Sequence, residues 1–149
     1  MFDTNPEAAI KALHKFLPRA GGEYAGTRNY DYGPMRRENV SMLSPWIRIR
    51  MLTEWQILSA VLQIHSVSSA SKFIDEVCWR TYWKGWLELR PSIWEDYIAE
   101  LAQDRERWKE DVDYTQIIRA RSGIATMDAW TSELIENGYL HNHTRMWYA

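Results

Sequence analysis

Apolar residues recur at helical spacing along most of this chain, and we find no run that alternates in the manner of a half-buried strand. The pattern predicts a first helix that opens at Asn5-Pro6 and closes before Pro18. Its apolar stripe is Ala9, Ile10, Leu13 and Phe16 or Leu17. Further helices are expected from 44, over 53–65, over 71–87, over 92–101, near 114–120, over 126–137 and around 141–145. The chain is therefore predicted to be all-α.

Local start and stop signals support these helices. Ser44 reads as an N-cap before Pro45, and Thr126 reads as another N-cap. Capping boxes are expected for Thr53 with Gln56 and for Ser92 with Glu95, while Gly138 marks a helix end. The glycine-containing stretch 21–43 is predicted to be an ordered loop, and the charged residues after Leu101 are predicted to form a connector.

Tryptophan is the outlier in composition, with nine residues beside eight tyrosines. Aromatic residues on this scale build a core, a stacking surface or an electron path, and composition does not choose among them. The net charge of −2 gives no overall basic field for nucleic acid. Five arginines nevertheless fall between Arg28 and Arg50, where a bidentate contact with phosphate would be favoured.

A single cysteine excludes an internal disulfide framework. Cys78 lies between Val77 and Trp79, so we expect a buried thiol. The first residues resemble no signal peptide, and no apolar run reaches the ~18 residues of a membrane span. We therefore expect a soluble, cytoplasmic protein with no membrane partner.

A first candidate site lies at Ser41 and Ser44, three residues apart at a predicted helix entrance. Two hydroxyls, free backbone N–H groups and nearby Arg48 would suit a phosphate. Ordinary N-capping explains the same local pattern, and the local pattern alone favours capping.

A second candidate is Glu76, Trp79, Arg80 and Trp83, which share one side of a helix. A Glu–Arg pair at this spacing is commonly a surface salt bridge, and a tryptophan stripe is commonly core. Buried together, these groups would instead form a polar site with aromatic walls for a planar heterocycle. From spacing alone, the core interpretation is favoured.

A third candidate is the segment with His141, Asn142 and Arg145, for which we expect one helix face to carry an imidazole, an amide and a guanidinium. His141 and His143 diverge on a helix and have no cysteine or aspartate cluster beside them. No metal site is therefore expected.

Together these motifs resemble the helical FAD-binding domain of the DNA photolyase and cryptochrome family. The resemblance runs from about Tyr24 to Ala149 and rests on five motifs in the family's order. They are Tyr24 with Arg28-Asn29, Val40 to Pro45, Glu76 to Thr81, Ser122 to Ala129, and Gly138 to Met146.

The resemblance implies a multi-helix orthogonal bundle that binds FAD. Ser41, Leu43 and Ser44 would hold the FAD pyrophosphate, and Tyr24 is a further cofactor contact. Glu76 and Arg80 would border the flavin cavity, Asn142 would approach the isoalloxazine, and Arg145 would lie beneath it. Glu76, Trp79 and Asn142 would serve catalysis, with Trp79 stacking on a flipped base and Glu76 hydrogen-bonding to it.

The implied activity is light-driven electron transfer with repair of pyrimidine dimers, which would make the parent protein a carbon–carbon lyase acting on UV-damaged DNA. A blue-light sensor without repair and a tryptophan-rich scaffold without cofactor stay open as alternatives. Residues 1–149 are expected to be a partial domain, without an N-terminal antenna domain and incomplete at the C-terminus. Flavin-contacting segments that the family carries after the last motif would then be missing.

Overall fold

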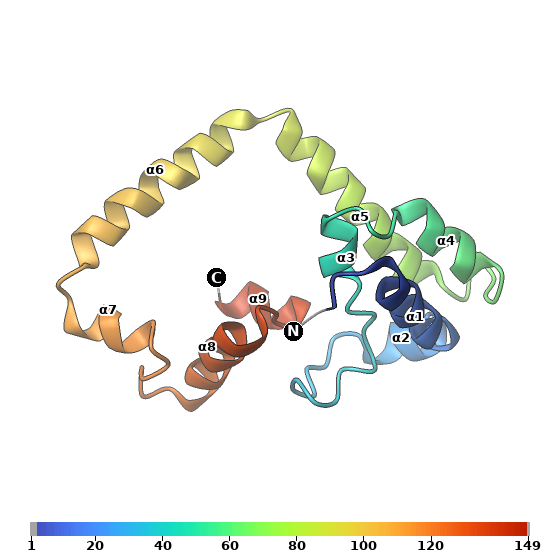
Figure 1. Ribbon diagram of the computed structural model, residues 1–149, viewed down its shortest axis with the longest axis horizontal. Coiled ribbons are helices and arrows are strands. Elements are labelled where there is room, and N and C mark those ends of the chain that lie inside the picture. Colours follow the sequence, from blue (N-terminus) through green and yellow to red (C-terminus); the bar gives the residue numbers. More distant parts are fainter. Residues whose placement is uncertain (1–2, 149) are drawn as a thin grey trace. The chain divides into compact units, whose positions relative to one another are not determined.

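The computed structural model describes residues 3–148, which form helices joined by loops without any strand (Figure 1). Within this range nine α-helices and one 3-10 helix follow one another. They are α1 (Pro6–Phe16), η1 (Leu17–Arg19), α2 (Gly22–Thr27), α3 (Ser44–Arg48), α4 (Glu54–Leu62), α5 (Ser71–Glu88), α6 (Pro91–Trp108), α7 (Val112–Ile117), α8 (Ala125–Asn137) and α9 (Asn142–Tyr148). The all-α prediction is confirmed.

Three helix ends follow the local signals. The Asn5 side chain accepts a hydrogen bond from the Ala8 N–H at 2.7 Å and caps α1. Thr53 and Gln56 form both bonds of the predicted capping box at the start of α4. Gly138 ends α8 in the left-handed conformation, with φ of 65°, where a side chain would be unfavourable.

Three predicted caps are wrong. Ser44 is the first residue of α3, whose N-cap is Leu43 without a side-chain hydrogen bond. Proline in the first turn also moves the start of α6 ahead of Ser92, so that Arg90 is its N-cap and the predicted box with Glu95 does not cap it. At α8 the N-cap is Ile124 rather than Thr126, because the helix already begins at Ala125.

Two segments predicted to lack helix are helical. The expected loop 21–43 contains α2, which the packing of the buried Tyr24 stabilises despite its glycines. The expected charged connector after Leu101 belongs to α6, which continues to Trp108. Gln, Glu and Arg are good helix formers, which favours helix in this charged segment. None of the residues of α6 is buried, so the helix has no buried apolar stripe.

The chain divides into two compact units, one up to Tyr82 and one from Trp83, with the boundary inside α5. In the first unit the rings of Phe16, Tyr24 and Phe73 meet with centroids 5.0–5.8 Å apart and tie α1, α2 and α5 together. Ile10 is 45% exposed, so its predicted place in the buried stripe of α1 is wrong.

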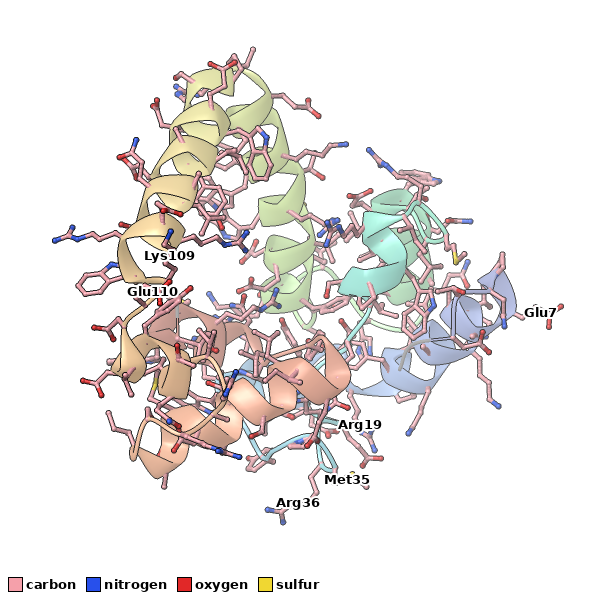
Figure 2. The ribbon with its side chains drawn as sticks, turned by 60° about the vertical axis from the view of Figure 1, so that its left-hand side comes forward. Glu7, Arg19, Met35, Arg36, Lys109 and Glu110 are labelled. Atoms are coloured by element: carbon pink, nitrogen blue, oxygen red, sulfur yellow. The ribbon has the colours of Figure 1, made fainter. Side chains whose placement is uncertain are left out.

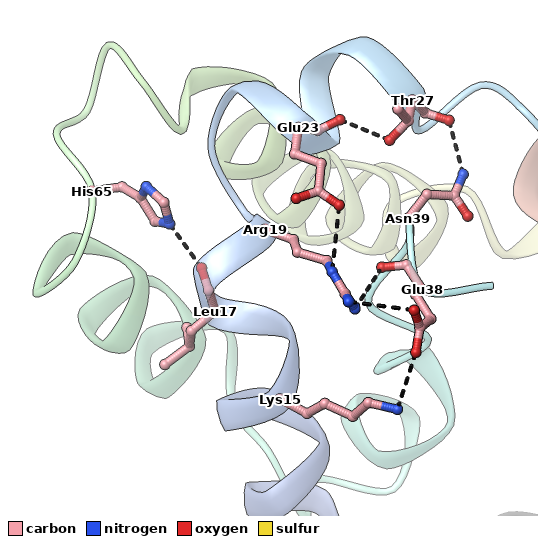
Figure 3. A network of polar contacts seen from close by, with 8 residues as sticks. All are labelled: Lys15, Leu17, Arg19, Glu23, Thr27, Glu38, Asn39 and His65. Carbon is pink, nitrogen blue, oxygen red and sulfur yellow. Dashed lines mark hydrogen bonds and ion pairs between the residues drawn. The ribbon is translucent and has the colours of Figure 1, made fainter. Parts of the chain in front are cut away.

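Gly21 lets the turn before α2 approach the segment that follows α4. A Cβ atom at Gly21 would come within 2.9 Å of the His65 ring and of the Ser69 hydroxyl. His65 Nε2 lies 2.7 Å from the Leu17 carbonyl oxygen, which fixes the same junction (Figure 3). The entry to α2 is thereby held in place. Met35 and Arg36 project outward from the loop that follows α2 (Figure 2).

Candidate functional site

Helix α5 carries three of the predicted site residues beside its buried face. Phe73 and Val77 are the buried residues of this helix. Glu76 and Arg80 each follow one of them by three positions and therefore flank the buried face. Both are partly exposed, so the site is set by the neighbouring elements and not by α5 alone.

Glu76 and Arg80 form ion pairs with two different elements. Glu76 Oε1 accepts a hydrogen bond from Arg28 Nη1 at 2.5 Å, and Arg28 is the C-cap residue of α2. Arg80 Nε lies 3.6 Å from Glu54 Oε1 in the first turn of α4. Each charge thus lies beside an opposite charge from another helix, which holds the two side chains in place at the surface of α5.

Trp79 is 51% exposed, so the interpretation of this residue as core is wrong. Its ring meets Tyr82 edge to face, with centroids 5.4 Å apart. Cys78 is exposed as well, which contradicts the expected buried thiol. Together with Asp75 these residues line an open hollow of about 520 Å³. The side of α5 around Trp79 therefore offers aromatic surface to a ligand.

The backbone next to Ser41 has an unusual conformation. Met42 has φ of 52°, which is unusual for a residue with a side chain. Beyond it Leu43 is almost fully buried and anchors the segment. The Ser41 hydroxyl oxygen accepts a long hydrogen bond of 3.5 Å from the Leu43 N–H. Ser44 begins α3 and its side chain caps no helix, so capping does not account for it.

Ser41 lines a cavity of about 320 Å³ between α1 and the loop. Three cationic residues and one anionic residue take part in the lining, together with Ser41 and apolar side chains. The charged members are Lys15, Arg19, Arg37 and Glu38. A cavity with this lining suits an anion that can also accept a hydroxyl hydrogen bond.

Arg37 and Asn39 hold the loop in this shape. The Arg37 side chain is 2% exposed, and its Nη2 lies 3.2 Å from Asp31 Oδ1. Asn39 Nδ2 donates to the carbonyl oxygens of Thr27 and Tyr30, each at 2.8 Å. The loop that supplies Arg37 to the cavity lining is therefore held by contacts among residues 27–39.

Tyr24, expected as a cofactor contact, has only 8% of its surface exposed. Its ring packs edge to face on Phe16 and Phe73. Packing of these rings gives Tyr24 a part in the core of the first unit.

The third motif belongs to the second unit. Asn142 and Arg145 are exposed on α9, three residues apart, and the Arg145 guanidinium lies 5.6 Å from the centre of the Tyr139 ring. His141 precedes α9 and is fully buried, so the prediction that it shares a helix face with them is wrong. Its Nδ1 accepts a hydrogen bond from the His143 N–H at 3.2 Å.

The structure thus groups the predicted residues by unit. Those of the first unit are Tyr24, Ser41, Leu43, Ser44, Glu76, Trp79 and Arg80, and those of the second are Asn142 and Arg145. Within the first unit, Arg28 ties the start of the loop to Glu76, while Ser41 further along the same loop lines the cavity.

Photo-lyases are similar in sequence to this chain over nearly its whole length. The deoxyribodipyrimidine photo-lyase of Escherichia coli (strain K12) is 25% identical over 150 residues, which covers 97% of this chain and 31% of that protein. The photo-lyase of Alkalihalophilus pseudofirmus is 26% identical over 141 residues, covering 94% of this chain and 29% of that protein. The mitochondrial photo-lyase of Saccharomyces cerevisiae is 26% identical over 151 residues, covering 97% and 27%.

The chain is a distant homologue of the deoxyribodipyrimidine photo-lyases. It spans less than a third of the length of these curated relatives. No family model matches the chain, and no solved structure matches it.

Sequence reasoning missed several residues around the cavity of this photo-lyase homologue. Lys15 lies on α1 and Arg19 on η1, outside every recognised motif, and Glu38 lies between two motifs. The sequence signal for this cavity was the concentration of arginines between Arg28 and Arg50, a range that includes Arg37.

Among residues 3–148, no group of three or more His, Cys, Asp or Glu side chains is arranged to hold a metal ion. No helix in the same range has both the length and the apolar character needed to cross a membrane.

Proposed function

We propose that this chain is part of an FAD-binding site in a photolyase-related flavoprotein that carries out light-driven electron transfer and repairs pyrimidine dimers in DNA. The similarity to photo-lyases along 94–97% of the chain carries the proposal. The five ordered motifs support it, because they include the serines and the Glu–Trp–Arg group from which such a site would be built.

The cavity beside Ser41 fits the diphosphate half of FAD in its chemistry. Its lining combines a hydroxyl with cationic side chains, which are the groups that bind phosphate oxygens. Ser41, Leu43 and Ser44 would hold the diphosphate through hydroxyl and backbone N–H groups. Bound FAD would supply the light absorption and the electron for dimer splitting.

The other predicted residues would position the flavin and the lesion. Arg80 and Glu76 would border the flavin, and their ion pairs with Glu54 and Arg28 would keep them in fixed orientations. Asn142 would approach the isoalloxazine, with Arg145 beneath the ring. Trp79 would stack on a flipped pyrimidine, for which its exposed ring is available.

Binding of FAD and of riboflavin, measured by quenching of flavin fluorescence, tests the cofactor assignment. FAD should bind and riboflavin should bind less tightly, since riboflavin lacks the diphosphate. Ser44→Ala should weaken FAD binding about tenfold, the value of one hydrogen bond to a charged group, and leave riboflavin unaffected.

Ser92→Ala is the matched control, because Ser92 also lies next to a proline in the first turn of a helix and belongs to no recognised motif. Equal losses in the two serine variants would contradict the diphosphate site. A chain that shows no saturable binding of FAD would remove the proposal.

A further inference from the structure

The Glu38 carboxylate forms ion pairs with the two cationic side chains of α1 and η1 that line the cavity. Lys15 Nζ lies 3.6 Å from Glu38 Oε1, and Arg19 Nη2 lies 3.3 Å from Glu38 Oε2. Arg19 also donates to the backbone carbonyl oxygen of Glu38 at 3.5 Å. Figure 3 shows the Glu38 carboxylate between the two cationic groups. Glu38 thus lies where an anionic ligand of these cations would lie.

All three groups line the same cavity as Ser41. The remaining cation of the lining, Arg37, is engaged by Asp31 and is almost completely buried. Lys15 and Arg19 differ from Arg37 because Glu38, with which both pair, also lines the cavity, whereas Asp31 does not. Replacing Glu38 by a ligand oxygen would leave the loop contacts of Arg37 and Asn39 intact.

The contact that Glu38 makes is weak enough to be exchanged. The side chains of Lys15 and Glu38 are 72% and 60% exposed, and ion pairs at such positions contribute little because water screens them. A diphosphate carries more charge and more acceptor oxygens than one carboxylate. It would also reach the Ser41 hydroxyl in the same cavity.

We infer that Lys15 and Arg19 are a binding site for the phosphate groups of a ligand, and that Glu38 is a built-in competitor which the ligand must displace. The inference rests on the proposed function in one respect, because Ser41 is assigned to the same diphosphate. It adds two cationic residues outside the family motifs and a carboxylate that sets the affinity of the site.

Calorimetric titration of the full chain with inorganic pyrophosphate tests the competition. Glu38→Gln keeps the size of the side chain and removes its charge, so pyrophosphate should bind about threefold more tightly, in line with the loss of an exposed ion pair. Glu23→Gln is the control, since Glu23 also pairs with Arg19, at 3.3 Å, but lies outside the cavity lining. It should leave pyrophosphate affinity unchanged.

The cation assignment has its own matched pair of variants. Lys15→Gln should weaken pyrophosphate binding about tenfold, because a charge-assisted hydrogen bond is lost. Lys11→Gln, one turn earlier on α1 and outside the lining, should not weaken it. Circular dichroism of the four variants should match that of the parent chain, since all the altered side chains are at the surface.

The same variants titrated with FAD separate this inference from the proposed function. FAD binding that Glu38→Gln and Lys15→Gln leave unchanged would overturn the inference while the FAD assignment stands. Pyrophosphate binding that responds to both variants, in a chain that binds no FAD, would sustain the inference and remove the proposed cofactor. Equal effects of Glu38→Gln and Glu23→Gln would also overturn the inference, because a general charge effect would then explain both.

Discussion

Trp79 leaves about half of its surface to solvent on a helix that buries Phe73 and Val77. A large aromatic ring in this position contributes less stability than a fully buried one, since only about half of its area is removed from water. Edge-to-face contact with Tyr82 orients the ring, about half of whose residue surface is exposed. This arrangement suits stacking on a base.

Trp79→Ala is therefore expected to weaken binding to dimer-containing DNA by about ten- to a hundredfold, the value of one stacked base. Fluorescence anisotropy with a labelled oligonucleotide that carries one dimer would measure it. Thermal stability and FAD affinity should change little, because surface substitutions usually alter stability by about 0.5 kcal/mol or less.

Trp55→Ala is the control for Trp79, as Trp55 is 78% exposed at the start of α4 in the same unit and belongs to no recognised motif. If both variants bind the lesion as well as the parent chain does, repair is no longer supported and a light sensor becomes the better interpretation.

At the scale of elements, the loop before α8 is held by one carboxylate. Asp128 accepts hydrogen bonds from the Ser122 hydroxyl at 2.6 Å, the Ser122 N–H at 2.7 Å and the Gly123 N–H at 3.2 Å. The Ser122 hydroxyl and then the Ser122 N–H lower the pKa of Asp128 from its ordinary value of 3.8, and partial desolvation opposes them. The charged form is thus the one that the fold favours.

Because the pKa of Asp128 is lowered on folding, its contribution to stability is present above the unfolded pKa and disappears as pH falls through the folded pKa. Asp128→Asn should therefore lower the melting temperature at neutral pH and bring the variant closer to the parent chain in acid below pH 3.8. Melting followed by circular dichroism across this range would measure it. A difference between the two chains that is constant with pH would contradict the role given to the charge.

At the scale of the whole molecule, the first unit depends on aromatic packing between helices that are distant in sequence. Phe16 on α1, Tyr24 on α2 and Phe73 on α5 meet in one cluster. The α5 positions that carry Glu76 and Arg80 are placed by this cluster, and so are Lys15 on α1 and Arg19 on the adjoining η1.

Phe73→Ala is expected to cost about 3–5 kcal/mol of unfolding free energy, because it leaves a cavity among well-packed rings. Urea denaturation would measure the loss. Trp94→Ala removes a larger ring that is 66% exposed on α6, and it should cost about 0.5 kcal/mol or less. Similar losses in the two variants would show that the cluster does not hold the unit together.

The start of α1 at Pro6, the Thr53–Gln56 box and the end of α8 at Gly138 could be predicted from sequence because each depends on residues within about four positions along the chain. The all-α class and the order of motifs that relates the chain to photo-lyases could also be predicted from the sequence. Caps were misplaced where proline or alanine began the helix earlier than the expected residue, as at Ser92 and Thr126.

Tertiary structure decided what contacts between distant residues control. Helix α2 exists because Tyr24 packs on Phe16 and Phe73, and Glu76 pairs with Arg28 across 48 positions of the chain. The exposure of Trp79 and the carboxylate that Glu38 places between Lys15 and Arg19 depend on which helix lies beside each side chain. Residue types and spacing specify the chemistry that is available, but only packing brings charges from separate segments to one cavity.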